Sequence, residues 1–89
     1  MAWTVELAPQ AQKTFRKLDR AIADRIIQNL EAVVALDDPH DRGTQLTGPL
    51  AGLWRYRIGD WRAIVRFEDE RVVILVLEVG HRREIYRRR

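Results

Sequence analysis

Apolar and polar side chains alternate over residues 3–7, WTVEL, which predicts a short β-strand at the start of the chain. From Pro9 onward the apolar residues recur every three or four positions, as they do on one face of a helix. A first helix is predicted to begin at Pro9, whose missing N–H suits a first helical turn, and a second after the N-cap residue Asp19. Asp37-Asp38-Pro39 ends the second helix, so the pair forms an antiparallel hairpin. The stripes expected to be buried are Ala8, Ala11, Phe15 and Leu18, then Ile22, Ile26, Leu30 and Val33.

The second half of the chain has the pattern of a sheet. Residues 37–52 concentrate turn-forming residues and are predicted to be the longest loop. Residues 53–67, LWRYRIGDWRAIVRF, form a tight β-hairpin around a two-residue turn. Residues 72–79 are nearly all apolar, which predicts a strand in the sheet interior that ends at Gly80.

Together these patterns predict an α+β fold. An N-terminal strand and an antiparallel two-helix hairpin precede a three-stranded antiparallel meander, and the helices pack on one face of an antiparallel sheet. We expect residues 1–89 to form a single domain.

The register of the hairpin places like charges together. Counting outward from Gly59-Asp60, Arg57 lies directly opposite Arg62. Two such charges about 5 Å apart repel by about 3 kcal/mol at an effective dielectric near 20, so the crowding indicates a site for an anion. The helices are expected to cover the apolar face, with Trp54, Tyr56, Ile58, Trp61, Ala63 and Val65. The face expected to be open to a partner carries Arg55, Arg57, Arg62 and Arg66.

Composition narrows the classes of function. The chain is 46% hydrophobic and 33% charged, which is typical of a globular protein. It has no cysteine and two histidines, so we expect no disulfide, no metal site and no cofactor. We find no signal-peptide pattern and no apolar run long enough to span a bilayer, and we expect a cytoplasmic location without a membrane partner.

The net charge of +3 is unevenly distributed. Residues 45–89 contain ten arginines, six acidic residues and no lysine. The planar guanidinium donates hydrogen bonds in a fork that matches phosphate oxygens, so this bias favours a phosphate-containing partner. His40 and the helix residues Lys13, Arg16, Lys17 and Arg20 are interpreted as ordinary surface residues.

The chain ends in the basic segment HRREIYRRR. Whether this segment is extended or forms one helical turn, Arg82 and Tyr86 lie on the same side of it. Arg83, Arg87, Arg88 and Arg89 are expected to add salt-dependent affinity for a phosphate-containing partner, as is Arg66 on the sheet.

Three motifs, LTGPLAG, WRYRIGDWRAIVRF and VGHRREIY, resemble those of the RelE toxins within the RelE/ParE superfamily, and the resemblance covers the whole chain. It implies a toxin that cleaves messenger RNA in the ribosomal A site without a metal and that a RelB-like antitoxin silences. It also implies functional positions at Arg55, Arg57, Arg62, Arg82 and Tyr86. Some relatives have lysines at the first two of these positions, so a lysine general base is not carried over to this chain.

RNA cleavage without a metal proceeds by attack of the ribose 2′-hydroxyl on the adjacent phosphate. Several arginines suit the stabilisation of the added phosphate charge, but they are too basic to accept a proton. His81 and Tyr86 are the two candidates for proton transfer. Two alternatives stay open: a ParE-like toxin that binds and poisons DNA gyrase, and a catalytically inactive binding relative.

Overall fold

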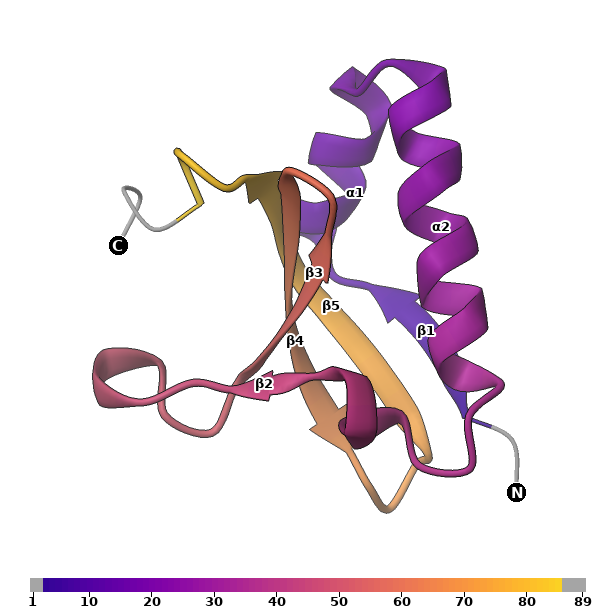
Figure 1. Ribbon diagram of the computed structural model, residues 1–89, viewed down its shortest axis with the longest axis vertical. Helices are drawn as coiled ribbons and strands as arrows, with labels where there is room; N and C mark the ends of the chain where they lie inside the picture. The colour runs from indigo at the N-terminus through magenta and orange to yellow at the C-terminus, as the bar shows by residue number, and fades with distance from the viewer. Residues whose placement is uncertain (1–2, 86–89) are drawn as a thin grey trace.

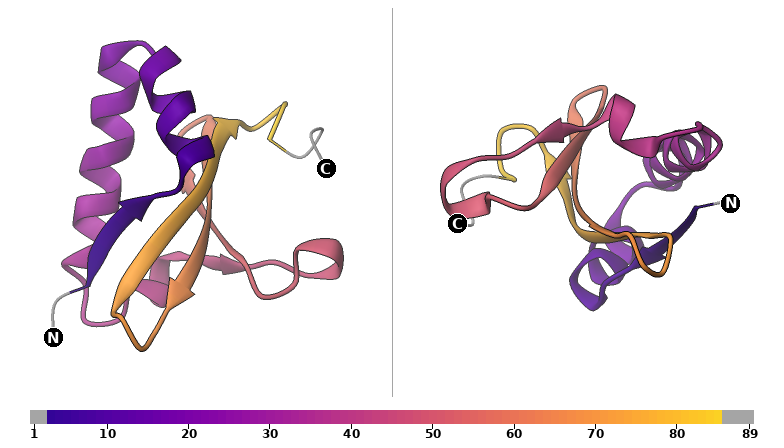
Figure 2. Two further views of the ribbon diagram at one scale, coloured as in Figure 1. Left: turned by 180° about the vertical axis from the view of Figure 1, so that it is seen from behind. Right: turned by 90° about the horizontal axis from the view of Figure 1, so that it is seen from below.

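The computed structural model describes residues 3–85 and confirms the α+β fold (Figure 1). Helices α1 and α2 form the predicted antiparallel hairpin and lie together on one side of the sheet (Figures 1 and 2). Two short 3₁₀ helices, η1 and η2, flank β2. In chain order the elements are β1 Thr4–Leu7, α1 Pro9–Lys17, α2 Arg20–Val34, η1 Pro39–Arg42, β2 Thr44–Gln45, η2 Gly48–Leu50, β3 Trp54–Ile58, β4 Trp61–Glu68 and β5 Val73–His81.

The strands are ordered β1-β5-β4-β3-β2, and β3, β4 and β5 form the predicted antiparallel meander. The sheet is mixed rather than wholly antiparallel, because β1 pairs in parallel with β5 along the register Thr4 to Val73 and Leu7 to Val76. The apolar strand β5 therefore has a neighbour at each edge. This arrangement explains why its side chains are so extensively buried, as its sequence predicts.

The core forms between the helices and the apolar face of the sheet, as the two periodicities predict. Tyr56 is 3% exposed in this core, and its hydroxyl donates a 2.6 Å hydrogen bond to the backbone oxygen of Pro39. That bond attaches η1 to the middle of β3, and burial raises the pKa of the Tyr56 hydroxyl. The buried core residues include Ala11, Ile26, Leu30, Val33, Ile58, Ala63, Val65, Ile74, Val76 and Val79.

Residues 37–52 are more ordered than the predicted loop. Thr44–Gln45 forms β2, which pairs with Trp54 and Arg55 of β3 and widens the sheet by one strand. The arm between β2 and β3 extends away from the helices (Figure 2). Sequence periodicity missed β2 because two polar residues cannot show an alternating pattern.

The prediction that Gly80 ends its strand is wrong, because β5 continues through Gly80 to His81. Glycine is needed there for space: a Cβ atom on Gly80 would lie 2.9 Å from Cδ1 of the fully buried Ile85. The backbone N–H groups of Glu84 and Ile85 both donate to the oxygen of His81, at 2.9 and 3.0 Å. The tail therefore folds back in one helical turn, which is one of its two predicted geometries.

His40 is not the isolated surface residue expected from sequence. Its ring stacks on Phe67 with centroids 3.7 Å apart and contacts Trp3 and Trp54 edge-on. Its Nδ1 atom lies 2.7 Å from a carboxylate oxygen of Asp38, and this hydrogen bond holds the pKa of Asp38 below its ordinary value. His40 thus joins the start of η1 to the end of β4.

Candidate functional site

The predicted hairpin register is confirmed. Arg57 pairs with Arg62, and Arg55 pairs with Ile64 on the same face. On the other side of β4, Arg62 lies opposite Gly80 of β5. Paired residues share a face of the sheet, so Arg55, Arg57 and Arg62 all belong to the face away from Ile58 and Trp61.

Arg62 does not lie on an open surface, contrary to the expectation for this face. It is 8% exposed, and its Nη1 atom donates to the backbone oxygens of Gly59 and Trp61 at 2.7 and 2.8 Å. The guanidinium is therefore folded over the turn between β3 and β4, where these bonds hold its orientation. Of the other three arginines predicted on this face, Arg57 and Arg66 are exposed and Arg55 is half-buried.

Two further arginines reach the same turn. The backbone N–H of Arg82 donates to the oxygen of Asp60 at 2.7 Å, and its Nε atom lies 3.7 Å from an Asp60 carboxylate oxygen. Arg25 of α2 approaches from the helix side: a Cβ on Gly59 would lie 3.0 Å from its Nη2 atom. We call Arg25, Arg62 and Arg82 the turn cluster.

Sequence reasoning predicted Arg62 and Arg82 in the turn cluster but missed Arg25. Arg25 immediately precedes the buried Ile26, on the flank of the apolar stripe of α2. That position shows that its side chain leaves the helix near the sheet. It does not show which end of which strand the guanidinium reaches.

Glu78 is a second residue that sequence reasoning missed. It is 6% exposed in β5, opposite Ile64, and therefore lies diagonally across from Arg62 on the same face. A carboxylate on this face attracts the neighbouring guanidinium groups and so opposes the repulsion between them. A bound anion is therefore not the only source of negative charge at the arginines.

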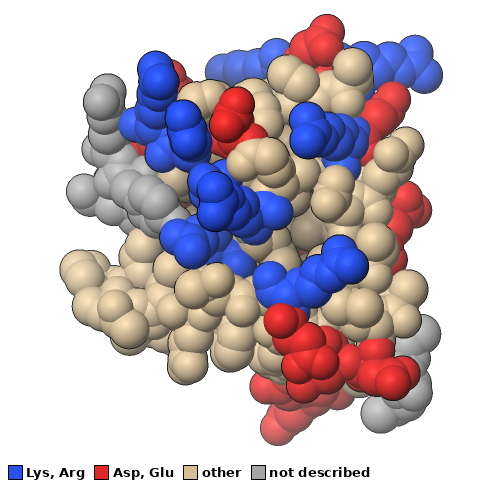
Figure 3. Space-filling model, viewed as in Figure 1, with Lys and Arg blue, Asp and Glu red and all other residues tan. Residues whose placement is uncertain are grey.

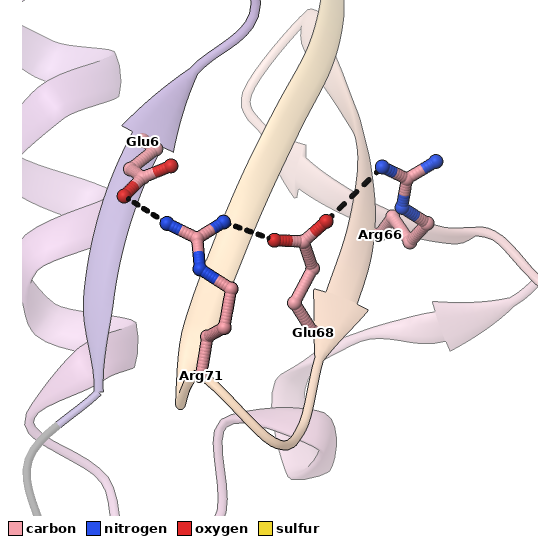
Figure 4. Close-up of polar contacts among 4 residues, drawn as sticks. All are labelled: Glu6, Arg66, Glu68 and Arg71. Carbon is pink, nitrogen blue, oxygen red and sulfur yellow. Dashed lines mark hydrogen bonds and ion pairs between the residues drawn. The ribbon is translucent and has the colours of Figure 1, made fainter.

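Arg66 is not part of the turn cluster. Its Nη2 atom donates to Glu68 at 3.1 Å, Glu68 also binds Arg71, and Arg71 binds Glu6 at 2.9 Å (Figure 4). The two arginines hold the pKa of Glu68 below its ordinary value. Arg66 therefore belongs to a charge-compensated chain near the opposite end of β4.

His81 also lies apart from the arginine face. It pairs with Trp61, and their rings meet edge to face with centroids 5.7 Å apart. Its Nδ1 atom accepts a 3.2 Å hydrogen bond from the backbone N–H of Arg83, which is exposed. Four predicted site residues, Tyr86, Arg87, Arg88 and Arg89, lie outside the described residues.

Residues 5–86 match the family model described as the ParE toxin of the type II toxin–antitoxin system parDE. The chain belongs to the RelE/ParE superfamily of type II toxins. It is also similar to Toxin RelG of Mycobacterium tuberculosis, with 31% identity over 99% of this chain and 100% of the relative.

Two solved complexes share the fold of this toxin. The toxin–antitoxin complex RelBE2 of Mycobacterium tuberculosis contains a chain that is 26% identical, with a TM-score of 0.82 over 91% of this chain and 99% of that chain. The archaeal RelE–RelB complex of Pyrococcus horikoshii OT3 contains one that is 25% identical, with a TM-score of 0.73 over 94% and 99%.

Charge is unevenly distributed over the toxin surface. Figure 3 shows Lys and Arg side chains across the middle and top of one face, while Asp and Glu gather below, where Figure 1 places the turn between β4 and β5. Within residues 3–85, no helix is long and apolar enough to cross a membrane. In the same range, no three His, Asp or Glu side chains form a group that could hold a metal ion.

Proposed function

We propose that this toxin is a ribosome-dependent endonuclease that cleaves messenger RNA in the A site by attack of a ribose 2′-hydroxyl on the adjacent phosphate. The observation that carries the proposal is the convergence of Arg62 and Arg82 on one two-residue turn, with Arg57 paired directly across from Arg62. Similarity to RelG and to RelE-type structures supports it.

In this mechanism the arginines stabilise the charge that develops on the phosphate oxygens. Arg62 is preorganised by its bonds to two backbone oxygens, so little reorganisation is needed when the phosphate arrives. Arg55, Arg57 and Arg82 complete the group of donors. Outside it, the residues proposed to bind the RNA or ribosome backbone are Arg83, Arg87, Arg88 and Arg89. Arg66 was also predicted to do so, but it binds Glu68, so we expect only a small contribution from it.

His81 and Tyr86 are the two candidates for proton transfer. Because the ring of His81 lies on the face opposite Arg62, it reaches the phosphate only if the RNA passes around this end of the sheet. The Nδ1 atom of His81 already accepts a bond from Arg83, so a neutral His81 in this arrangement carries its proton on Nε2. To accept the 2′-hydroxyl proton at Nε2, the ring must adopt the other tautomer and give up that bond. Single-turnover cleavage by His81→Ala and Tyr86→Phe tests both roles, and near-normal rates in both variants would reject them.

The ribosome is expected to supply the substrate geometry that this site lacks. Arginines position charge but provide no strong base, so productive alignment of the 2′-hydroxyl must come from the bound substrate. We therefore expect the purified toxin to cleave free RNA slowly or not at all. Rapid hydrolysis of free RNA would contradict this mechanism.

A second candidate function is binding and poisoning of DNA gyrase, which the ParE description of the matching family model favours. Transcript mapping by primer extension after brief expression in cells separates the two. Codon-phased cleavage within translated regions supports the nuclease. Intact transcripts together with DNA damage would support gyrase poisoning and reject the nuclease.

We also propose a RelB-like antitoxin as the partner, since the RelBE2 and archaeal relatives are toxin–antitoxin complexes. An acidic, partly disordered antitoxin would fold on the basic surface or displace the tail that carries Tyr86. Hydrogen exchange of the toxin with and without antitoxin tests this. Neutralisation without protection of either region would count against it. We also propose a cytoplasmic location, because the proposed target is the translating ribosome.

A further inference from the structure

An open groove of about 600 Å³ lies between α1 and the ends of β4 and β5. One wall carries Lys13 and Lys17, which are four residues apart on α1 and therefore lie on the same side of that helix. Trp61 and His81 line the sheet side, and Glu84 of the tail turn also lines the groove. The assigned arginine chemistry uses neither lysine nor Trp61.

The groove combines three kinds of groups. The lysines are exposed and supply ammonium groups for an anion. Trp61 and His81 meet at an interplanar angle of 82°, so their rings form an aromatic corner. Because Nδ1 of His81 accepts from Arg83, the neutral ring carries its hydrogen on Nε2 and can donate from there.

We propose that this groove binds a nucleotide of the RNA substrate that flanks the cleaved phosphate. Its phosphate binds Lys13 and Lys17, and its base packs against Trp61. Aromatic side chains beside basic ones are the usual means of holding single-stranded nucleic acid, because every base has a π-face. The volume falls within the range of small-molecule sites. This inference rests on the proposed RNA substrate.

Glu84 favours a nucleotide over an acidic peptide as the occupant. Its carboxylate accepts hydrogen bonds from ribose hydroxyls and from the amino groups of bases, whereas the side chains of an acidic peptide offer it no donor. The ligand class that satisfies the lysines, the aromatic corner and the carboxylate together is therefore a nucleotide.

The position of the groove fits a substrate that continues past the cleavage site. Trp61 and Arg62 are consecutive residues of β4, so their side chains project to opposite faces of the sheet. The groove and the arginine face therefore lie back to back at the same end of the sheet. An RNA strand that passes around this end contacts both.

A direct test uses a 5′-phosphorylated trinucleotide with deoxyribose throughout, which lacks the 2′-hydroxyl and cannot be cleaved. It is titrated into the free ¹⁵N-labelled toxin. We expect shifts at the Trp61 indole N–H and at the amides of Lys13 and Lys17. The double variant Lys13→Gln/Lys17→Gln should weaken binding about tenfold. Arg16→Gln, an exposed α1 residue outside the groove, should change it less than about twofold.

Two results of this titration would overturn the proposal. One is the absence of shifts at Trp61 and the groove lysines while the arginine face responds. The other is that a hexaglutamate peptide produces the same shifts as strongly as the trinucleotide, which would identify an acidic-peptide site.

Cleavage on ribosomes separates failure of the groove from failure of the proposed function. The double lysine variant should need about tenfold more toxin for half-maximal cleavage, with an unchanged maximal rate. If the wild-type toxin does not cleave but binds the trinucleotide through the lysines, the nuclease proposal fails and nucleotide binding in the groove stands. If it cleaves, and the double variant matches it in both assays, the groove proposal fails.

Discussion

The two ends of strand β4 contain similar residues in opposite electrostatic states. At the β4–β5 turn, Arg66 and Arg71 are bound to Glu68 and Glu6, so each guanidinium meets a carboxylate. At the β3–β4 turn, Arg62 binds two backbone oxygens, which orient the guanidinium. Two acids thus match Arg66 and Arg71 at the β4–β5 turn, which we call the compensated end. At the β3–β4 turn, which we call the basic end, Arg57, Arg62 and Arg82 outnumber the nearby acids.

This difference shows which arginines are available to an anion. An end with more arginines than acids keeps net positive charge that attracts phosphate, whereas an arginine matched by carboxylates must first give them up. Asp60 near Arg82 and the buried Glu78 moderate the basic end without matching the number of its arginines. An arginine near a turn is therefore not available to an anion by position alone. The number of acidic residues around it determines whether it is.

Replacing an arginine at the basic end should produce the largest functional loss. Arg62→Gln removes a preorganised donor and should lower single-turnover cleavage on ribosomes by about 10² to 10³-fold. Arg71→Gln, at the compensated end, should leave the rate within about twofold. Because Arg62 is buried, circular dichroism must show that the variant is folded, and the exposed Arg57→Gln provides a second measurement. Equal losses at the two ends would remove the distinction between them.

Removing a carboxylate should change the stability of the protein by different amounts at the two ends of β4. Glu78→Gln leaves buried arginine charge uncompensated and should lower the free energy of unfolding by about 3 kcal/mol in urea denaturation. The matched variant Glu68→Gln should have a much smaller effect, because its partners Arg66 and Arg71 are exposed and solvent screens their charges. A cost for Glu78→Gln no greater than that for Glu68→Gln would contradict the compensating role of Glu78.

Space at Gly80 sets the position of the tail at the basic end. Gly80→Ala brings a Cβ within 2.9 Å of Ile85 and should cost about 1–3 kcal/mol in unfolding free energy. Ile85→Ala removes the clash, so the same glycine substitution should cost less in that background. A double-mutant cycle from urea denaturation measures this coupling. Additive costs would show that the two residues do not oppose each other in the folded protein.

The weakest expected effect concerns acid stability near the compensated end. The hydrogen bond from His40 lowers the folded-state pKa of Asp38 below the ordinary value of 3.8. Its stabilising contribution is therefore present above that value and is lost as the pH falls through the folded-state pKa. Asp38→Asn should lower the melting temperature at neutral pH, and the difference should disappear in strong acid. Asp37→Asn is the neighbouring control, and a constant difference at all pH values would oppose this assignment.

Much of the fold was readable from local pattern. The helical stripes, the two-residue turn and the apolar run of β5 predicted α1, α2 and the meander, and the count from Gly59 predicted the Arg57–Arg62 pair. The local pattern did not predict three other features, namely the parallel pairing of β1, the polar strand β2 and the course of the chain past Gly80. These features depend on which segment pairs with which edge of the sheet. They also depend on the space left by side chains that are distant in the sequence.

The candidate site was likewise predicted only in part from the sequence. Strand alternation alone determines that Arg55, Arg57 and Arg62 share a face, because side chains on a pleated strand must alternate. Tertiary packing determined three further features of the site, namely the approach of Arg25 to Gly59, the burial of Arg62 near Glu78 and the separation of His81 from the arginines. Periodicity describes directions relative to one element, whereas charge compensation depends on distances between elements that only the folded chain brings together.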